Sequence, residues 1–218
     1  MSPRRPPASA AAPAPADTAN AVVRPEKCPA IGPDGRARCP WGTATADYRE
    51  YHDTEWGVPL HGVVALFERL SLEAFQSGLS WLTILRKRAA FRRAFAGFDP
   101  AAVAAFTEDD VAQLLADPGI VRNRAKIEAT VRNARVVTEL DEDLDSLLWS
   151  FAPDPAGRPA PRTLAEIPAR TEESTAMARA LRRRGLTFVG PTTCYALMQA
   201  TGMVDDHLAG CFRHTTPG

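Results

Sequence analysis

The stretch Leu114-Leu115-Ala116-Asp117-Pro118-Gly119-Ile120-Val121-Arg122-Asn123-Arg124-Ala125-Lys126 joins two segments of helical periodicity through a tight Pro-Gly turn. Proline followed by glycine ends a helix, and apolar residues at helical spacing resume with Ile120 and Ile127. The N–H groups that open the second helix have no partners within it, so they suit an anion such as a phosphate. An ordinary helix–helix corner is the alternative, and the basic residues directly after the turn favour phosphate contact.

Helical periodicity extends in both directions from this turn, and strand signals are nearly absent. Apolar residues recur at helical spacing over 63–76, where Gly78 is the expected C-cap, and Ser80 caps the helix that follows. Further helices are predicted after Pro100 and Thr107 and over 174–184 and 191–199. Residues 144–151 are predicted to form a short apolar turn or helix, and 153–161 a proline-rich loop. The fold class is therefore predicted to be all-α.

Composition limits the classes of partner. The chain has 218 residues, with 26 Lys and Arg against 26 Asp and Glu, so its net charge is zero. That balance gives no global attraction to nucleic acid or membranes, although basic clusters near residues 86–93, 122–135 and 182–184 permit a basic stripe. Because no apolar run approaches the ~18 residues that a membrane span needs, no membrane partner is expected.

The first 38 residues differ from the rest, since they are rich in Pro and Ala and poor in large apolar side chains. Such a segment cannot bury enough surface to offset its ordering entropy, so 1–38 is predicted to be a disordered tail without a targeting signal. A single helical domain is predicted over 39–214. With only 4 Cys, the chain fits a reducing compartment, the cytoplasm.

Two pairs of residues far apart in the chain have the chemistry of one metal site. Cys39 and His52 are separated by twelve residues, and His207 and Cys211 by three. Two Cys and two His form a usual closed set for structural zinc, and an i, i+4 pair shares one face of a helix. Each half is weak evidence alone, so unrelated core or surface residues remain the alternative. A disulfide is disfavoured in a chain with so few cysteines.

Glu73 and a group of aromatic residues mark a second candidate site. Glu73 projects from the apolar face of its predicted helix, where a carboxylate is costly unless it is hydrogen-bonded or lines a pocket. A partly exposed glutamate near the helix end is the alternative. Most of the Trp and Tyr residues fall close by in the sequence, either as core or as a platform for a flat, electron-poor ring. They are Trp41, Tyr48, Tyr51, Trp56 and Trp81.

Several motifs occur in a consistent order between Cys39 and Cys211. They are Arg38-Cys39-x-Trp41, Tyr51-His52-Asp53-x-Glu55-Trp56-Gly57-Val58-Pro59, Leu72-Glu73-x-x-x-x-Gly78-Leu79-Ser80-Trp81, Gly119-Ile120-x-Arg122-Asn123-Arg124-x-Lys126-Ile127, Trp149-Ser150-Phe151, Phe188-Val189-Gly190-Pro191-Thr192 and Asp206-His207. Together they resemble the DNA-3-methyladenine glycosylase I family, zinc-containing members of the helix-hairpin-helix superfamily. Asp205 departs from the pattern, since the family has Asn before the Asp-His pair.

The resemblance implies a role for each matching residue. Its structural zinc would be held by Cys39, His52, His207 and Cys211. Glu73 would recognise the damaged adenine as the catalytic carboxylate. Bonding and stacking on the base would come from Tyr51 and Trp81, with Tyr48 and Trp41 beside them. The hairpin would grip the DNA backbone through Gly119, Val121, Arg122 and Arg124.

The implied activity is hydrolysis of the N-glycosidic bond of 3-methyladenine in double-stranded alkylated DNA by a monomeric enzyme. Bifunctional relatives place a lysine at the start of the second hairpin helix, where this chain has Asn123, so no strand cleavage is expected. Asp141 and Asp143 lie at the distance of the aspartate that other superfamily members use, but they are interpreted as linker charges. Two alternatives stay open: a broader enzyme that also removes 3-methylguanine, and a non-catalytic, zinc-stapled DNA-binding module.

Overall fold

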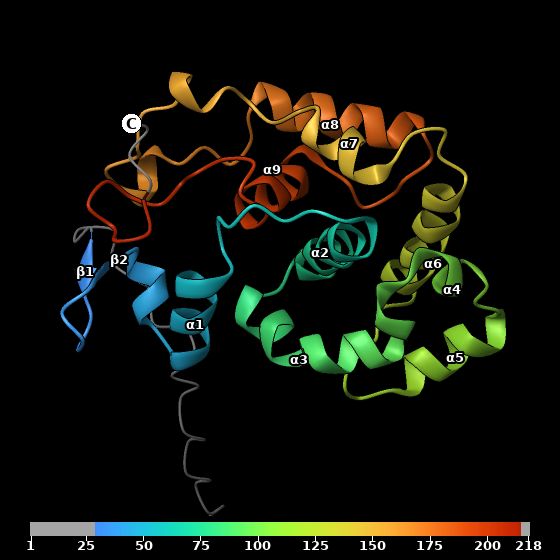
Figure 1. The fold of residues 1–218 in the computed structure, drawn as a ribbon. Helices are drawn as coiled ribbons and strands as arrows, with labels where there is room; N and C mark the ends of the chain where they lie inside the picture. Colours follow the sequence, from blue (N-terminus) through green and yellow to red (C-terminus); the bar gives the residue numbers. More distant parts are fainter. Residues whose placement is uncertain (1–28, 215–218) are drawn as a thin grey trace, which may run out of the picture.

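The computed structural model describes residues 29–214, and this part of the chain is mostly helical, as predicted (Figure 1). The α-helices are α1 (Ala46–Thr54), α2 (Val63–Gln76), α3 (Trp81–Ala94), α4 (Pro100–Ala104), α5 (Glu108–Ala116), α6 (Arg124–Thr138), α7 (Leu144–Trp149), α8 (Glu172–Arg183) and α9 (Pro191–Ala200). Short 3₁₀ helices are η1 (Pro40–Thr43), η2 (Ala96–Phe98), η3 (Pro155–Gly157) and η4 (Leu164–Glu166). Two antiparallel strands, β1 (Ala30–Ile31) and β2 (Ala37–Arg38), form a small hairpin.

Helix α2 is the centre of the molecule, because α3, α6, α7 and α9 all pack against it (Figure 1). Its sequence is apolar on nearly every face, and Leu66, Phe67 and Phe75 are completely buried. A helix that is apolar all round belongs inside a protein. Polar side chains on the packed faces of α2 are therefore brought into the interior, and this applies to Glu73.

The C-terminal end of α2 is held by a buried lysine from the hairpin segment. Lys126 Nζ donates hydrogen bonds to the carbonyl oxygens of Phe75, at 2.8 Å, and Ser77, at 2.5 Å. These carbonyls have no partner within the helix, so a cation at this end both caps α2 and complements its dipole. Gly78 follows with a φ of +82°, which is the backbone conformation expected just after a helix.

The prediction of a disordered tail is wrong for residues 29–38, since these residues form the β1–β2 hairpin. The prediction considered only large apolar side chains, but a buried arginine organises this segment. Arg38 is 1% exposed, and its guanidinium bonds both to Asp34 in the hairpin turn and to Asp53 in α1. Residues 1–28, the remainder of the predicted tail, lie outside the described residues.

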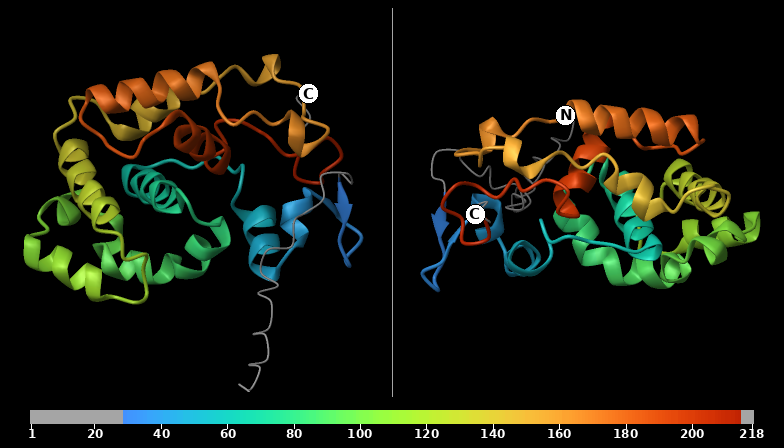
Figure 2. Two further views of the ribbon diagram at one scale, coloured as in Figure 1. Left: turned by 180° about the vertical axis from the view of Figure 1, so that it is seen from behind. Right: turned by 45° about the horizontal axis from the view of Figure 1, so that its top comes forward.

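The described beginning and end of the chain lie side by side, as both views in Figure 2 show. The Phe212 N–H donates to the Ala37 carbonyl at 2.8 Å, which joins the C-terminal segment to β2. Residues 207–211 form a turn rather than a helix, because Gly210 takes a φ of +86° and the Cys211 N–H bonds to the Leu208 carbonyl. No helix in the range 29–214 has the length and apolarity to cross a membrane.

Substitution of Gly202 should weaken the packing of α9 on the connection between α1 and α2. An added Cβ would lie 2.7 Å from the Pro59 nitrogen and 2.8 Å from the Val58 carbonyl carbon, at a φ of +72°. Gly202→Ala should therefore lower the free energy of unfolding by about 3 kcal/mol or more in urea titrations.

Gly35→Ala is the matched control, because Gly35 has a φ of +75° but no atom within 4 Å of the added Cβ. Only backbone strain of about 1 kcal/mol is expected there. Equal losses of stability in the two variants would contradict the close approach at Gly202.

Candidate functional site

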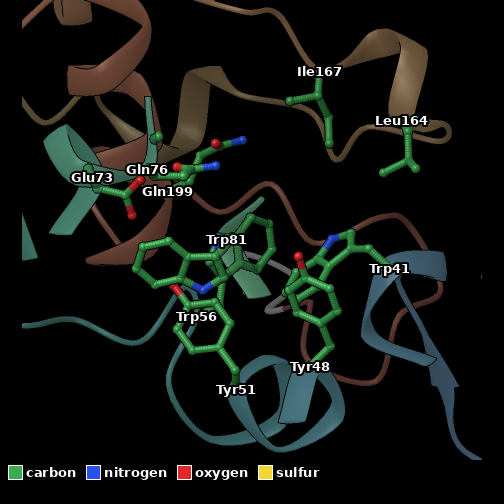
Figure 3. A pocket seen from close by; sticks show the side chains of 11 residues that line it. Trp41, Tyr48, Tyr51, Trp56, Glu73, Gln76, Trp81, Leu164, Ile167 and Gln199 are labelled. Atoms are coloured by element: carbon green, nitrogen blue, oxygen red, sulfur yellow. The ribbon is translucent and has the colours of Figure 1, made fainter. Parts of the chain in front are cut away.

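A cavity of about 360 Å³ opens between α1, α2, α3, α9 and the η4 segment (Figure 3). Such a volume is sufficient for a small planar ligand. It is lined by Trp41, Tyr48, Tyr51, Trp56, Glu73, Gln76, Trp81, Leu164, Ile167, Ala196 and Gln199. The structure thus places Glu73 and all four predicted base-binding aromatics around one space.

Glu73 is 5% exposed, and no other described residue forms a hydrogen bond with its carboxylate. Desolvation raises its pKa from the ordinary 4.5 to about 7, and the nearby positive charge of Arg69 opposes part of this rise. The alternative of a partly exposed glutamate is therefore wrong. A buried carboxylate without a donor can accept hydrogen bonds from a ligand and complement a positive charge.

The aromatic residues form a connected wall of the cavity (Figure 3). The rings of Tyr51 and Trp81 are tilted at 43° with centroids 5.4 Å apart, and the Trp41 ring lies edge-on to Tyr48 at 5.8 Å. The Tyr48 hydroxyl accepts a hydrogen bond from the Leu82 N–H at 3.1 Å, so it fixes the first turn of α3. The ligand space is thus bounded by rings that η1, α1 and α3 carry.

A buried arginine, Arg69, holds Tyr51 in this wall. Arg69 donates a 2.7 Å hydrogen bond to the Tyr51 hydroxyl, and its guanidinium lies 5.7 Å from the Trp81 ring centroid. Glu55 pairs with Arg69 at 3.4 Å and also with Arg88. This charge network holds Tyr51 in place, and none of its three charged residues lines the cavity.

Five further residues that line the cavity, of which Ala196 on α9 is one, were missed by the sequence analysis. Gln76 lies one helical turn after Glu73 on α2, so helical spacing could have identified it. Gln199 comes from the end of α9, and Leu164 and Ile167 come from the η4 segment. These three are distant from Glu73 in the sequence, and no spacing rule links them to it.

The second candidate site is a cluster of four buried side chains, which are Cys39, His52, His207 and Cys211. Their ligand atoms all lie within 4.8 Å of one another. Cys211 Sγ is 3.4 Å from His52 Nε2 and 3.7 Å from His207 Nδ1. Bond lengths of 2.3 Å to sulfur and 2.0–2.1 Å to nitrogen around a tetrahedral ion give S···N edges of about 3.6 Å. The group could therefore hold one metal ion with little movement.

The surroundings of both histidines also fit a metal site. His52 Nδ1 lies 2.8 Å from Asp53 Oδ1, and His207 Nε2 lies 3.1 Å from the Trp56 carbonyl oxygen. Each acceptor oxygen receives a hydrogen bond from one ring N–H. The other ring nitrogen then carries a lone pair that faces the cluster. The neighbouring Cys39 thiol is the main cause that lowers the pKa of the Cys211 thiol, and a lowered pKa favours the thiolate that metals bind.

The hairpin residues lie away from both sites, on the connection between α5 and α6. Val121 is half-buried, and Arg122 and Arg124 are exposed. The Gly119 N–H already donates to Asp117 Oδ1 at 2.7 Å, and Lys87 Nζ binds the Pro118 and Gly119 carbonyls. In this structure the Gly119 amide is thus engaged within the turn.

The remaining predicted side chains have local roles in the structure. Asn123 caps α6 by accepting a 3.2 Å hydrogen bond from the Lys126 N–H. Asp143 caps α7 through the Ser146 N–H, and Asp141 is exposed. Neither aspartate lines the cavity. Asp205, the residue that differs from the family pattern, accepts a hydrogen bond from the His207 N–H at 3.0 Å. It therefore stabilises the segment that carries His207.

Comparison with known proteins gives matches over most of the chain. A family model described as methyladenine glycosylase matches residues 41–214. DNA-3-methyladenine glycosylase 1 of Escherichia coli (strain K12) is 45% identical over 177 residues, which cover 80% of this chain and 95% of that protein. DNA-3-methyladenine glycosylase of Haemophilus influenzae is 43% identical over 178 residues, covering 80% and 96%. The crystal structure of 3-methyladenine DNA glycosylase I aligns with a TM-score of 0.77 at 44% identity, covering 82% of this chain and 100% of that one.

Glu73→Gln should stabilise the protein in a pH-dependent manner. Because the folded-state pKa of about 7 lies above the ordinary 4.5, the protonated carboxyl favours folding and the ionised form opposes it. The cost of burying the charge is absent below about pH 4.5, grows as pH rises towards 7, and is complete above pH 7. The variant should therefore gain on the order of 3 kcal/mol over the natural chain at pH 8, and much less at pH 5, in urea unfolding.

Glu139→Gln provides the control, because Glu139 is exposed at the end of α6. If the gain in unfolding free energy for Glu73→Gln stays constant between pH 5 and pH 8, ionisation of the buried Glu73 carboxyl does not destabilise the fold.

Proposed function

The chain belongs to the methyladenine glycosylase family, and from this we propose that it hydrolyses the N-glycosidic bond of 3-methyladenine in alkylated DNA, with Glu73 as the recognising carboxylate. The observation that carries the proposal is the buried, unpartnered carboxylate of Glu73 in a cavity walled by aromatic rings. This combination of negative charge and ring faces suits a flat cation.

The mechanism follows from the chemistry of the substrate. A 3-methyladenine base in DNA carries a positive charge, so its glycosidic bond is already weakened and the leaving base needs little acid assistance. The enzyme must flip the nucleotide out of the helix, at a cost of a few kcal/mol, and hold the base while water attacks the sugar carbon. Glu73 accepts hydrogen bonds from the adenine edge and complements its charge. Tyr51 and Trp81 stack on the ring, with Tyr48 and Trp41 beside them.

The substrate discrimination follows from the same carboxylate. Adenine presents a donor amine at C6, whereas guanine presents an acceptor oxygen there. A buried Glu73 carboxylate favours the donor and repels the acceptor, so 3-methylguanine is the poorer substrate.

We propose that the cluster of four ligands binds one structural zinc ion per chain. Four protein ligands leave no coordination position for a water, so the ion would supply folding stability and no chemistry. Tyr51 directly precedes His52, and Trp56 offers its carbonyl to His207. The metal would therefore fix the segment that carries the aromatic wall of the base pocket.

The DNA backbone is the proposed partner of the hairpin. The open N–H groups at the start of α6, near Val121, and the exposed side chains of Arg122 and Arg124 are suited to phosphates. We propose that Gly119 also belongs to this contact, because the lack of a side chain there lets the DNA backbone approach the turn closely. The active unit is proposed to be a monomer formed by residues 39–214 and to work in the reducing cytoplasm, where the cysteine ligands stay available.

A simple hydrolysis without strand cleavage is proposed, because the two described lysines beside the hairpin, Lys87 and Lys126, both hold their ammonium groups on backbone carbonyls. Asn123 occupies the first position, and Lys126 is buried with its ammonium group bonded to two carbonyls. An imine with the abasic sugar would need a free, accessible amine.

The function is tested by incubating the purified protein with methylated duplex DNA and separating the released bases by chromatography. The natural chain should release 3-methyladenine, and Glu73→Gln should release it about 10- to 100-fold more slowly, because hydrogen bonds to the charged group are lost. Borohydride should trap no covalent complex with the DNA.

This assay also separates the alternatives. A broader enzyme would release 3-methylguanine at a comparable rate. A non-catalytic DNA-binding module would release neither base, and its behaviour would not respond to Glu73→Gln. If Glu73→Gln keeps full activity in a folded protein, the assignment of Glu73 is wrong.

The metal proposal predicts one zinc ion per purified chain by elemental analysis. Asp53→Asn removes the carboxylate that orients His52, so the affinity for zinc should fall about 10- to 100-fold in competition with a chromophoric chelator. Asp47→Asn is the matched control on the same helix, since Asp47 pairs with Arg86 at the surface. Unchanged affinity in Asp53→Asn would contradict the proposed orientation.

A further inference from the structure

Asp206 is a buried carboxylate, 3% exposed, that directly precedes His207 of the metal cluster and bonds to Gln199, which lines the cavity. Three side chains donate hydrogen bonds to it. They are the Tyr195 hydroxyl at 2.5 Å, Gln199 Nε2 at 2.8 Å and Arg158 at 2.9 Å. Both of its oxygens therefore act as hydrogen-bond acceptors, one for Arg158 and the other for Tyr195 and Gln199.

This acceptor fixes the orientation of the Gln199 amide. An ionised carboxylate has no proton to donate, so only the NH₂ end of the amide can face it. The Oε1 end must then point away from Asp206. In the described structure no residue donates a hydrogen bond to that oxygen, and Gln199 lines the cavity.

The cavity therefore contains two acceptors with no internal donor, one from each of two helices in contact. Glu73 comes from α2 and Gln199 from α9, and these helices pack against each other. Figure 3 shows both side chains gathered at one end of the cavity, with most of the aromatic rings on the other side. Gln76 lies beside them, but no described neighbour fixes its amide, so it can turn either end towards a ligand.

We propose that Gln199 is a second specificity-determining residue for the base, and that Asp206 is the positioning residue that fixes it. This inference rests on the proposed function. The exocyclic amine of 3-methyladenine has two N–H groups, and Glu73 and Gln199 each accept one of them. A purine with an oxygen at C6 would instead place its acceptor against two oxygens, which leaves both unsatisfied and strengthens its rejection.

The first experiment compares release of 3-methyladenine and 3-methylguanine from methylated duplex DNA by the natural chain and by Gln199→Met. The substitution keeps the length of the side chain but removes the acceptor. The ratio of the two release rates, adenine over guanine, should fall about tenfold or more, because only the amine loses a partner.

Tyr195→Phe is the matched control, since it removes a different donor from Asp206 and Tyr195 does not line the cavity. This variant should keep the ratio of the natural chain. If Gln199→Met slows both bases in equal proportion, Gln199 has a structural role only and the proposal is overturned.

Asp206→Asn tests the positioning role in the opposite direction. An asparagine can donate to Gln199 Oε1, so the amide can rotate and present its NH₂ end to the cavity. The rate of 3-methylguanine release should then rise above that of the natural chain. The measurement is made on protein that elemental analysis shows to have the same metal content as the natural chain. An unchanged ratio in such protein would contradict the role of Asp206.

A measurement on the ligand does not depend on the folding of any variant. Quenching of tryptophan fluorescence gives the affinity of the natural chain for free 3-methyladenine and for its analogue with one methyl group on the exocyclic nitrogen. If both N–H groups are bound, the analogue should bind about tenfold more weakly, and equal affinities would overturn the proposal. Failure of the proposed function is distinguishable, because the natural chain would then release no 3-methyladenine.

Discussion

Burial of one carboxylate on the central helix is the constraint on which the site depends. Most of α2 is packed against neighbouring helices, and Glu73 lies on a buried part of it, so its carboxylate is held away from bulk water. A charge in such a place is unfavourable until a ligand supplies donors and positive charge. Under the proposed function, the protein keeps an unsatisfied group that the cationic base would satisfy, and part of the stability of the empty protein is given up for recognition.

The fold keeps this arrangement rigid by joining parts of the chain that are far apart. Lys126 ties the hairpin segment to the end of α2, a few residues beyond Glu73. A second set of contacts holds the aromatic wall, since Arg69 donates to the Tyr51 hydroxyl and pairs with Glu55. The hairpin segment and the aromatic wall of the cavity are therefore both tied to the central helix by polar contacts of buried or half-buried side chains.

Sequence reasoning identified what depends on local pattern and on recognisable chemistry. The helices, the anomaly of Glu73 and the cysteine–histidine pairs all follow from spacing or from the cost of burying a group. The β1–β2 hairpin was missed because Arg38 folds it through ion pairs, which leave no apolar pattern. Gln199, Leu164 and Ile167 were missed because only the packing of distant segments brings them to the cavity. The turn at 207–211 was missed because i, i+4 spacing does not distinguish a helix from a turn closed by Gly210.

The metal cluster has a consequence for the biosynthesis of the protein. His52 and Cys211 are separated by 159 positions, and nearly all of the helical chain lies between them. Metal coordination therefore cannot assist the early helices as they emerge from the ribosome, and it can form only after the chain has been brought almost to its native topology. A chain that ends prematurely, or whose last segment misdocks, never completes the ligand set. Metal uptake would thus report that synthesis and folding have both been completed.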